Sequence, residues 1–223
     1  LHAAYFSAGI GRGDEVLVPA MTFAATGNAA LYLQAKPVFV DVHPHTGNID
    51  VQDAARKVTK KTRASVAVDY AGRPADLYAC RSLAKKRKLV FIEDGAQSLG
   101  ARYCGKWVGT QADMTMFSFH PVKSITTGEG GIIVTDSEAL YRQLKLFRNH
   151  GITRDAYFVK KSEGPWHQEM HALGYNYRIT DIQTALGESQ LKRLDTFIKK
   201  RRAAAGRYPA LLKGILGLVL PAK

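Results

Sequence analysis

Short apolar segments alternate with longer helical patterns from residue 14 onward, and this alternation restricts the fold more than any other feature of the chain. It is typical of βαβ units around a mostly parallel sheet. Residues 38–40 and 89–92 are continuously apolar, as strands covered on both faces must be. We therefore expect an α/β fold with three layers, α/β/α. The pattern predicts strands at residues 16–19, 37–42, 63–70, 89–93, 114–119 and 132–135, and helices at residues 23–34, 51–58, 76–88, 137–149 and 180–208.

The composition is that of a globular protein, because 46% of the 223 residues are hydrophobic and 23% are charged. A chain of this length buries a substantial core without disulfide or metal cross-links. Cys80 and Cys104 form no CxxC pattern, so we expect neither a disulfide scaffold nor a thiolate zinc site. No uninterrupted apolar run reaches the ~18 residues that span a bilayer. We therefore expect a soluble, cytoplasmic protein without a membrane partner.

The net charge of +13 suggests an anionic partner: nucleic acid, a membrane surface or a phosphorylated small molecule. The basic runs at residues 57–63, 81–88 and 199–202 fall on or beside amphipathic helical patterns. Solvated helix faces explain such runs more simply than a nucleic-acid groove, which favours interleaved aromatic residues or a reading helix. We expect no nucleic-acid partner and keep a non-catalytic, nucleic-acid-binding domain as the alternative from another functional class.

The helix expected at residues 180–208 has a start signal of its own, because Thr180 and Gln183 form a capping-box pattern. Pro209 is expected to end or kink this helix, since proline removes a backbone donor and clashes with the preceding turn. Residues 149–177 show no clear period and predict a long loop. Apolar residues at helical spacing predict a buried stripe on the last helix: Ile182, Leu186, Leu194 and Ile198.

Three short motifs fit ordinary structure better than a binding site. The glycines at residues 9–13 resemble a dinucleotide loop, but they follow a helical stretch and precede a strand, so they indicate a helix C-cap and turn. His167 and His171 are spaced as a helical metal pair, yet the pattern is not H-E-x-x-H and no third ligand is near in sequence. Residues 43–45 indicate a turn after a strand. We expect no metal site.

Asp94 stands just beyond the carboxyl end of the buried strand expected at residues 89–93, where open α/β sheets place their ligand chemistry. A carboxylate at this position must be solvated, hydrogen-bonded or paired with a cation, because burying it alone costs several kcal/mol. The simpler interpretation is that Asp94 caps the turn at residues 95–98. A single aspartate on its own favours that interpretation.

The loop at residues 117–131 combines glycines, small hydroxyl residues and one lysine. Glycines let backbone amides approach an anion closely, and four hydroxyl side chains are candidate donors to phosphate oxygens: Ser118, Ser124, Thr126 and Thr127. Lys123 is a candidate nucleophilic amine, provided that burial or positive neighbours lower its pKa from the usual ~10.4. A lysine considered alone is more simply a surface charge.

Several motifs follow one another in a fixed order, at residues 21–26, 40–42, 93–100, 118–131 and 174–178. Together they resemble the DegT/DnrJ/EryC1/StrS family of sugar aminotransferases, and the resemblance covers essentially the whole chain. It implies the large domain of a fold-type-I enzyme that depends on pyridoxal 5′-phosphate, with a three-layer α/β/α architecture and a mostly parallel sheet. It also implies a homodimer.

The resemblance implies a role for each matching residue. Lys123 resembles the lysine whose amine is linked covalently to pyridoxal phosphate, and Asp94 the carboxylate that pairs with the pyridine nitrogen and keeps it protonated. Gln97 resembles the residue that hydrogen-bonds to the phenolic oxygen of the cofactor. Phe23 resembles the aromatic residue that stacks on the cofactor ring. Ser118 resembles a phosphate ligand.

Asn176, or else Arg178, resembles a residue that reaches the cofactor phosphate in the neighbouring subunit, so that the site is completed only in a dimer. The implied reaction transfers an amino group from L-glutamate to a nucleotide-linked 4-keto-6-deoxy sugar. Residues 119–131 look most like the enzymes that make UDP-4-amino-4,6-dideoxy-N-acetyl-β-L-altrosamine for pseudaminic acid synthesis. Other members with nearly the same cofactor residues aminate other UDP- or dTDP-linked ketosugars, and these acceptors stay open.

Two departures from the family pattern concern the limits of the chain. The Gly-Thr-Ala/Ser turn that binds phosphate in the family normally precedes the helix that begins here at Leu1, and the smaller C-terminal domain normally follows the last long helix. We therefore expect residues 1–208 to be a cofactor-binding large domain that is truncated at its N-terminus. Residues 209–223 are expected to begin a small domain that is mostly missing.

Overall fold

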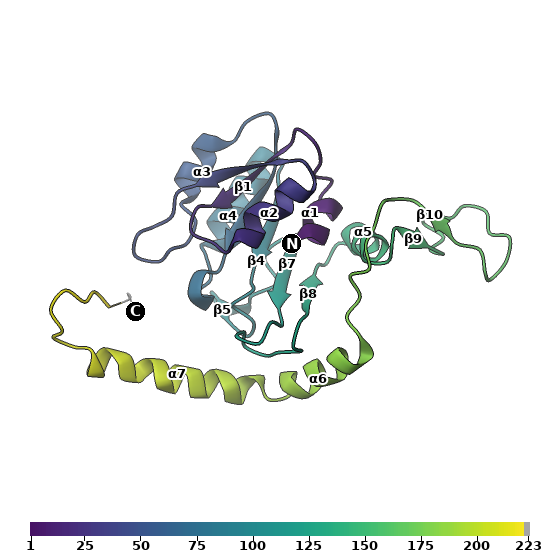
Figure 1. Ribbon diagram of the computed structural model, residues 1–223. Helices are drawn as coiled ribbons and strands as arrows, with labels where there is room; N and C mark the ends of the chain where they lie inside the picture. The colour runs from purple at the N-terminus through teal and green to yellow at the C-terminus, as the bar shows by residue number, and fades with distance from the viewer. Residues whose placement is uncertain (221–223) are drawn as a thin grey trace.

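A six-stranded sheet forms the centre of the computed structural model, which describes residues 1–220 (Figure 1). Its strand order is β2-β1-β3-β4-β7-β8. The first five strands are parallel, and β8 is antiparallel to β7. The mostly parallel sheet expected from the sequence is thereby confirmed. The strands are β1 (Glu15–Pro19), β2 (Lys36–Val40), β3 (Thr62–Val68), β4 (Val90–Asp94), β7 (Met114–Ser118) and β8 (Gly131–Val134).

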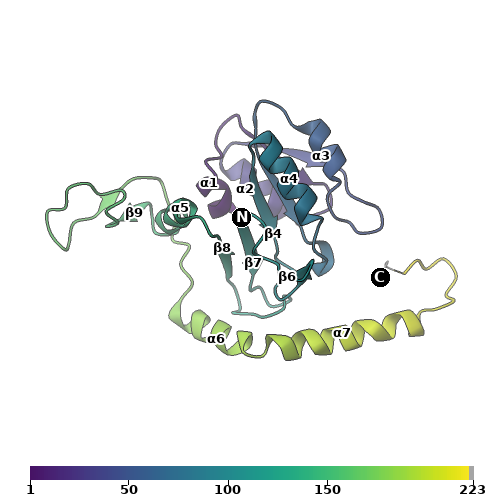
Figure 2. The same ribbon diagram turned by 180° about the vertical axis from the view of Figure 1, so that it is seen from behind.

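Helices cover both faces of the sheet, which confirms the three layers (Figures 1 and 2). Successive strand residues point to opposite faces, so in β1 Val16 and Val18 enter one core cluster and Leu17 enters the other. The first cluster packs under α1 (His2–Ser7), α2 (Ala24–Tyr32) and α5 (Glu138–Arg148), and the second under α3 (Val51–Lys57) and α4 (Leu77–Arg87).

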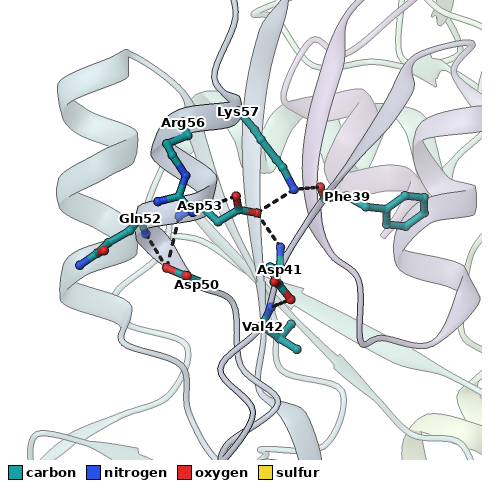
Figure 3. Close-up of polar contacts among 8 residues, drawn as sticks. All are labelled: Phe39, Asp41, Val42, Asp50, Gln52, Asp53, Arg56 and Lys57. Atoms are coloured by element: carbon teal, nitrogen blue, oxygen red, sulfur yellow. Dashed lines mark hydrogen bonds and ion pairs between the residues drawn. The ribbon is translucent and has the colours of Figure 1, made fainter.

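Helix α3 illustrates how local polar contacts fix an element at the end of a strand (Figure 3). The Asp50 carboxylate caps the helix by accepting hydrogen bonds from the backbone amides of Gln52 and Asp53, at 2.8 and 3.2 Å. Asp53 accepts a 2.8 Å hydrogen bond from the Asp41 amide and forms a 2.7 Å ion pair with Lys57. The Asp41 amide, and then the Lys57 ammonium, lower the pKa of Asp53 to about 2.

Two two-stranded hairpins and a single 3-10 turn complete the small elements: β5 (Arg102–Tyr103) with β6 (Lys106–Trp107), β9 (Ile152–Thr153) with β10 (Glu169–Met170), and η1 (Tyr70–Gly72). The segment at residues 149–177, predicted as a loop, contains the β9-β10 hairpin, which projects from the body beside α5 (Figure 1). His167 and His171, spaced as a helical metal pair, are not on a helix. The carboxylate of Glu169 lies between them, 3.1 Å from His167 Nε2 and 2.8 Å from His171 Nε2.

The turns expected near the N-terminus are present. Helix α1 is followed by Gly9, whose φ of +73° lies in the left-handed region that favours glycine, and its amide donates to the Phe6 carbonyl. This confirms a C-cap and turn in place of a dinucleotide loop. Residues 44–46 form the expected turn after β2. None of the helices between residues 1 and 220 is long and apolar enough to cross a lipid bilayer.

The C-terminal helical region differs from the prediction, because two helices replace the single one: α6 (Asp181–Leu191) and α7 (Leu194–Leu211). The capping box of Thr180 and Gln183 is confirmed at the start of α6. At the break, the Arg193 amide donates to the carbonyl only three residues before it, and Arg193 has a ψ of 2°. No glycine or proline marks this position, so the break was not readable from local sequence.

The buried stripe predicted for this region is wrong. Ile182 is 85% exposed and Leu186 is 43% exposed, whereas Leu194 and Ile198 are half-buried against the loop after β4. The region lies along the lower edge of the sheet in Figure 1 and does not pack into a helical layer. Helical spacing predicts which residues share one face of a helix. It does not predict whether another part of the molecule packs against that face.

Pro209 does not end the last helix, because α7 continues to Leu211. The proline removes one backbone donor near an exposed helix end, where water solvates the freed carbonyl group. Residues 212–220 that follow form neither a helix nor a strand. Of the segment expected to begin a small domain, residues 221–223 lie outside the described residues.

Candidate active site

Asp94 is the last residue of β4, at the carboxyl edge of the parallel strands, and it is only 5% exposed. Its Oδ2 accepts a 2.9 Å hydrogen bond from the hydroxyl of Thr26 on α2. Its Oδ1 accepts a 3.2 Å hydrogen bond from the Ala96 amide, so the turn-capping interpretation is also correct. The carboxylate is thus buried and hydrogen-bonded at a sheet edge where α/β proteins bind ligands.

Burial and nearby hydrogen-bond donors shift the pKa of Asp94 in opposite directions. Burial raises the pKa of Asp94, while the Thr26 hydroxyl, the Ala96 amide and the positive charge of Lys123 lower it. Thr26 is itself fixed, because its hydroxyl lies 2.7 Å from that of Thr22 and its carbonyl accepts a 2.8 Å hydrogen bond from the Tyr5 hydroxyl. Asp94 is therefore an anchored acceptor for a positively charged donor.

Lys123 lies half-buried in the loop between β7 and β8, and β7 is the neighbour of β4, which ends in Asp94. The Lys123 amide donates a 3.0 Å hydrogen bond to the His120 carbonyl, which closes a turn. Residues of the loop, α6 and α7 border a cavity of about 260 Å³, which Lys123 lines together with Ser124, Phe197 and Arg201. Lys123 thus borders this cavity, whose lining does not include Asp94.

Helices α6 and α7 hold the Lys123 loop from outside the sheet, beneath the carboxyl edge (Figure 2). The Arg201 guanidinium donates to the carbonyl oxygens of Lys123 and Ser124, at 2.9 and 3.0 Å. The Gln183 amide donates a 2.8 Å hydrogen bond to the Glu129 carbonyl at the far end of the loop. Arg201 is exposed to solvent, so these contacts form at the surface.

Two hydroxyl groups expected to donate to phosphate are already used within the loop. Thr126 Oγ1 donates to the Phe119 carbonyl at 3.0 Å, and Thr127 Oγ1 donates to the Glu129 carbonyl at 2.7 Å. The expectation of four phosphate donors is therefore wrong for these two residues, because a hydroxyl has a single proton to donate. Ser118, half-buried at the end of β7, only accepts a hydrogen bond, from the His120 amide. Its proton stays available.

Phe23 and Gln97 also lie at this edge, on segments next to Asp94. Phe23 precedes α2 and its side chain is 80% exposed, while its carbonyl accepts a hydrogen bond from the amide of Thr26. Gln97 is exposed on the loop three residues after Asp94. The fold therefore brings five of the sequence-predicted residues to one edge of the sheet: Phe23, Asp94, Gln97, Ser118 and Lys123.

Asn176 lies elsewhere, on the segment that returns from the β9-β10 hairpin past α5. It forms an isolated bridge with Asn149, and the neighbouring Arg178 donates a 2.7 Å hydrogen bond to the Asn149 side chain. Within residues 1–220, no hydrogen bond or ion pair joins Asn176 to the other five candidates. The exposed Tyr175 and Tyr177 on either side of it stack with their ring centroids 5.0 Å apart.

Two residues of the site were missed by the sequence interpretation. Thr26 belongs to a motif that was noticed at residues 21–26, but nothing local shows that its hydroxyl meets a carboxylate 68 residues away. Arg201 was assigned to a solvated basic helix face, and this assignment is incomplete because its guanidinium holds the Lys123 loop. No local sequence signal distinguishes Arg201 from its basic neighbours.

The donor set at this edge fits pyridoxal phosphate. A buried carboxylate with anchored oxygens suits a protonated ring nitrogen, and an exposed aromatic side chain before α2 suits a flat ring. The Ser118 hydroxyl, which has a proton to donate, suits a phosphate oxygen of the cofactor. The Lys123 amine suits the carbonyl carbon of the cofactor's aldehyde group.

Comparison with known proteins shows independently which family the chain resembles. A sequence model of the DegT/DnrJ/EryC1/StrS aminotransferase family matches residues 1–222. The chain is 41% identical over 208 residues to GDP-perosamine synthase of Escherichia coli O157:H7, covering 93% of the chain and 54% of that protein. It is 43% identical over 211 residues to UDP-4-amino-4,6-dideoxy-N-acetyl-beta-L-altrosamine transaminase of Campylobacter jejuni, with coverages of 93% and 54%.

Solved structures show the same similarity. Helicobacter pylori PseC, an aminotransferase involved in the biosynthesis of pseudoaminic acid, superimposes with a TM-score of 0.86 at 33% identity, covering 96% of this chain and 56% of that one. DesV of S. venezuelae, solved with a ketimine intermediate, gives a TM-score of 0.89 at 34% identity, with coverages of 100% and 57%. The chain spans about half the length of the curated relatives it matches.

Proposed function

The chain belongs to the DegT/DnrJ/EryC1/StrS aminotransferase family, and from this membership we propose that its protein is a sugar aminotransferase that depends on pyridoxal phosphate, as the enzymes of the family do. One observation carries the proposal. A buried carboxylate, Asp94, is anchored by two hydrogen bonds at the edge of the sheet where the adjacent strand β7 leads into the loop that carries Lys123.

The mechanism follows from the positions of these side chains. When bound, pyridoxal phosphate supplies an electron-withdrawing ring that stabilises negative charge at the α-carbon of the amino donor. In the proposed site Asp94 accepts a hydrogen bond from the ring nitrogen and keeps it protonated. Lys123 Nζ would hold the cofactor covalently, and its amine would act as the base that takes up a proton from the α-carbon of the amino donor. Such proton transfer contributes roughly 10²–10⁴ in rate.

The remaining candidates position the cofactor in this proposal. The Phe23 ring covers one face of the cofactor ring, the Gln97 amide donates to its phenolic oxygen, and the Ser118 hydroxyl donates to its phosphate. Asn176, or else Arg178, reaches the phosphate held by a second copy of the chain in a homodimer. The lack of contacts between Asn176 and the other five candidates is what such a role in the neighbouring subunit requires.

The proposed substrates are L-glutamate as amino donor and a nucleotide-linked 4-keto-6-deoxy sugar as acceptor. A UDP-linked acceptor of pseudaminic acid synthesis is favoured by the similarity to the Campylobacter jejuni transaminase and to PseC. The similar identity to GDP-perosamine synthase keeps other nucleotide sugars as the second candidate. Both cysteines are free, which favours a reducing, cytoplasmic compartment. We further propose that residues 1–208 are the large, cofactor-binding domain.

The test is the absorbance spectrum of the full-length protein after addition of pyridoxal phosphate, followed by assay with glutamate against a panel of nucleotide-linked ketosugars. The parent is expected to gain a visible band, which Lys123→Ala loses together with turnover. Lys60→Ala, at an exposed lysine far from the carboxyl edge, is the control and should keep both. Normal turnover by Lys123→Ala, or no band in the parent, would contradict the proposal.

A further inference from the structure

Two carboxylic side chains are completely buried behind the proposed site. Asp69 follows β3 and Glu93 is the penultimate residue of β4, and both are 0% exposed. Because side chains alternate along a strand, Glu93 points to the face of the sheet opposite that of Asp94. No ion pair joins Asp69 or Glu93 to a lysine, arginine or histidine within residues 1–220.

Both carboxylate oxygens of Asp69 accept a hydrogen bond, whereas only one oxygen of Glu93 does. Asp69 accepts from the Ser98 hydroxyl at 2.5 Å with one oxygen, and from the Ala75 amide at 3.0 Å with the other. Glu93 Oε2 accepts from the Thr115 hydroxyl at 2.8 Å and from the Gly109 amide at 3.3 Å. Glu93 Oε1 is buried, and no donor among residues 1–220 reaches it.

The two carboxyl side chains lie on the same face of neighbouring strands, because Glu93 pairs with Ala67 of β3 and Asp69 follows Ala67 by two residues. Two ionised carboxylates buried side by side repel each other and have no proton to share, so a proton on one of them relieves the repulsion. Both Asp69 oxygens already receive a donor, whereas Glu93 Oε1 has none. We propose that Glu93 is held as the neutral acid and donates a hydrogen bond from Oε1 to the Asp69 carboxylate, as a positioning residue for the loop after β4.

The titration behaviour agrees with this geometry. Burial and the charge of Asp69 raise the pKa of Glu93 to about 8, while burial raises the pKa of Asp69 to about 6. The other titratable groups nearby are acids as well: Asp94 on β4, Asp76 before α4 and the thiol of Cys80 on α4. Since none of them supplies a positive charge, a retained proton is the way to reduce repulsion.

The pair acts on the site through Asp69. The Asp69 amide donates to the Asp94 carbonyl at 3.1 Å, and its carboxylate holds Ser98 in the loop at residues 95–100, which carries Gln97. Ser98 also closes this loop, because its amide donates to the Gly95 carbonyl at 3.0 Å. The importance of this loop for cofactor binding rests on the proposed function, but the protonation of Glu93 does not.

The test is a pH titration of the carboxyl carbon signals by NMR in the full-length protein without cofactor, with Glu93→Gln to assign the signal. We expect the Glu93 signal to stay in its protonated position at neutral pH and to move only near pH 8. Titration of Glu93 at its ordinary value near 4.5 would overturn the proposal. Because no cofactor is present, this result is independent of whether the protein is an aminotransferase.

Thermal unfolding gives the second readout. The pKa of Glu93 is higher in the folded chain than in the unfolded one, so stability should fall as the pH rises from about 4.5 to about 8. Glu93→Gln keeps a donor that cannot ionise and should lose the part of this decline above about pH 6, where Asp69 is already ionised, whereas Glu93→Ala removes the donor and should lower the melting temperature at every pH. The control Glu188→Gln, on exposed α6, should retain the parent's decline. Equal melting curves for Glu93→Gln and Glu93→Ala would contradict the proposal.

Discussion

The end of β4 and the loop after β7 supply the two central groups of the proposed site, and the fold holds them in different ways. Asp94 is buried and bonded to a hydroxyl on a core helix, so its position depends on the packing of the sheet. Lys123 is half-buried on a loop that is tied by an exposed arginine of α7. Substitutions around Asp94 should therefore affect stability and activity together, and those around Lys123 mainly activity.

Asp94→Asn is expected to have the largest effect. The amide keeps the shape of the side chain but cannot hold a positive charge on the ring nitrogen of the cofactor, so kcat should fall by roughly 10²–10³, as for the loss of one preorganised electrostatic group. The measurement is kcat together with the thermal melting temperature. Asp136→Asn, at an exposed aspartate after β8, should change neither quantity. An active Asp94→Asn protein would remove Asp94 from the proposed chemistry.

Thr26→Val is expected to have the second largest effect, because it removes the hydroxyl donor from a buried carboxylate. The loss should lower the free energy of unfolding by about 1.5–3 kcal/mol, the range for hydrogen bonds to charged groups. Since the Thr26 hydroxyl lowers the pKa of Asp94, its removal raises that pKa further, and the acid limb of the kcat/KM profile should move to higher pH. Thr26→Ser keeps the donor and should restore the profile. An unmoved profile for Thr26→Val would show that this bond does not tune Asp94.

Arg201→Gln is expected to have the smallest effect, and it tests the loop that carries Lys123. The exposed guanidinium bridges two backbone carbonyls of a surface loop, so its removal loosens the loop without removing any core packing. We expect a several-fold loss in kcat with an unchanged melting temperature. Arg202→Gln makes the same change of charge one residue away and should leave kcat unaltered. A lower melting temperature for Arg201→Gln would mean that α7 stabilises the core as well as the loop.

Local sequence predicted the sheet well, because its strands are short apolar runs bounded by turn residues, and all six were found within a few residues of their expected positions. It failed for α6 and α7. The apolar spacing at Ile182 and Leu186 has a helical period, but a period indicates only which residues share a face. Whether that face meets another part of the molecule depends on segments far away in the chain.

The sequence alone determined the alternation of strands and helices and the placement of Asp94 and Lys123 at strand ends, because these depend on residues close together in the chain. The tertiary structure decided which groups surround them. Thr26 and Asp94 are separated by 68 residues, and Arg201 and Lys123 by 78. Asp69 and Glu93 likewise share one face of the sheet only because β3 and β4 lie side by side. Such contacts depend on the folded arrangement of the whole chain, because no local pattern encodes the partner of a buried polar group.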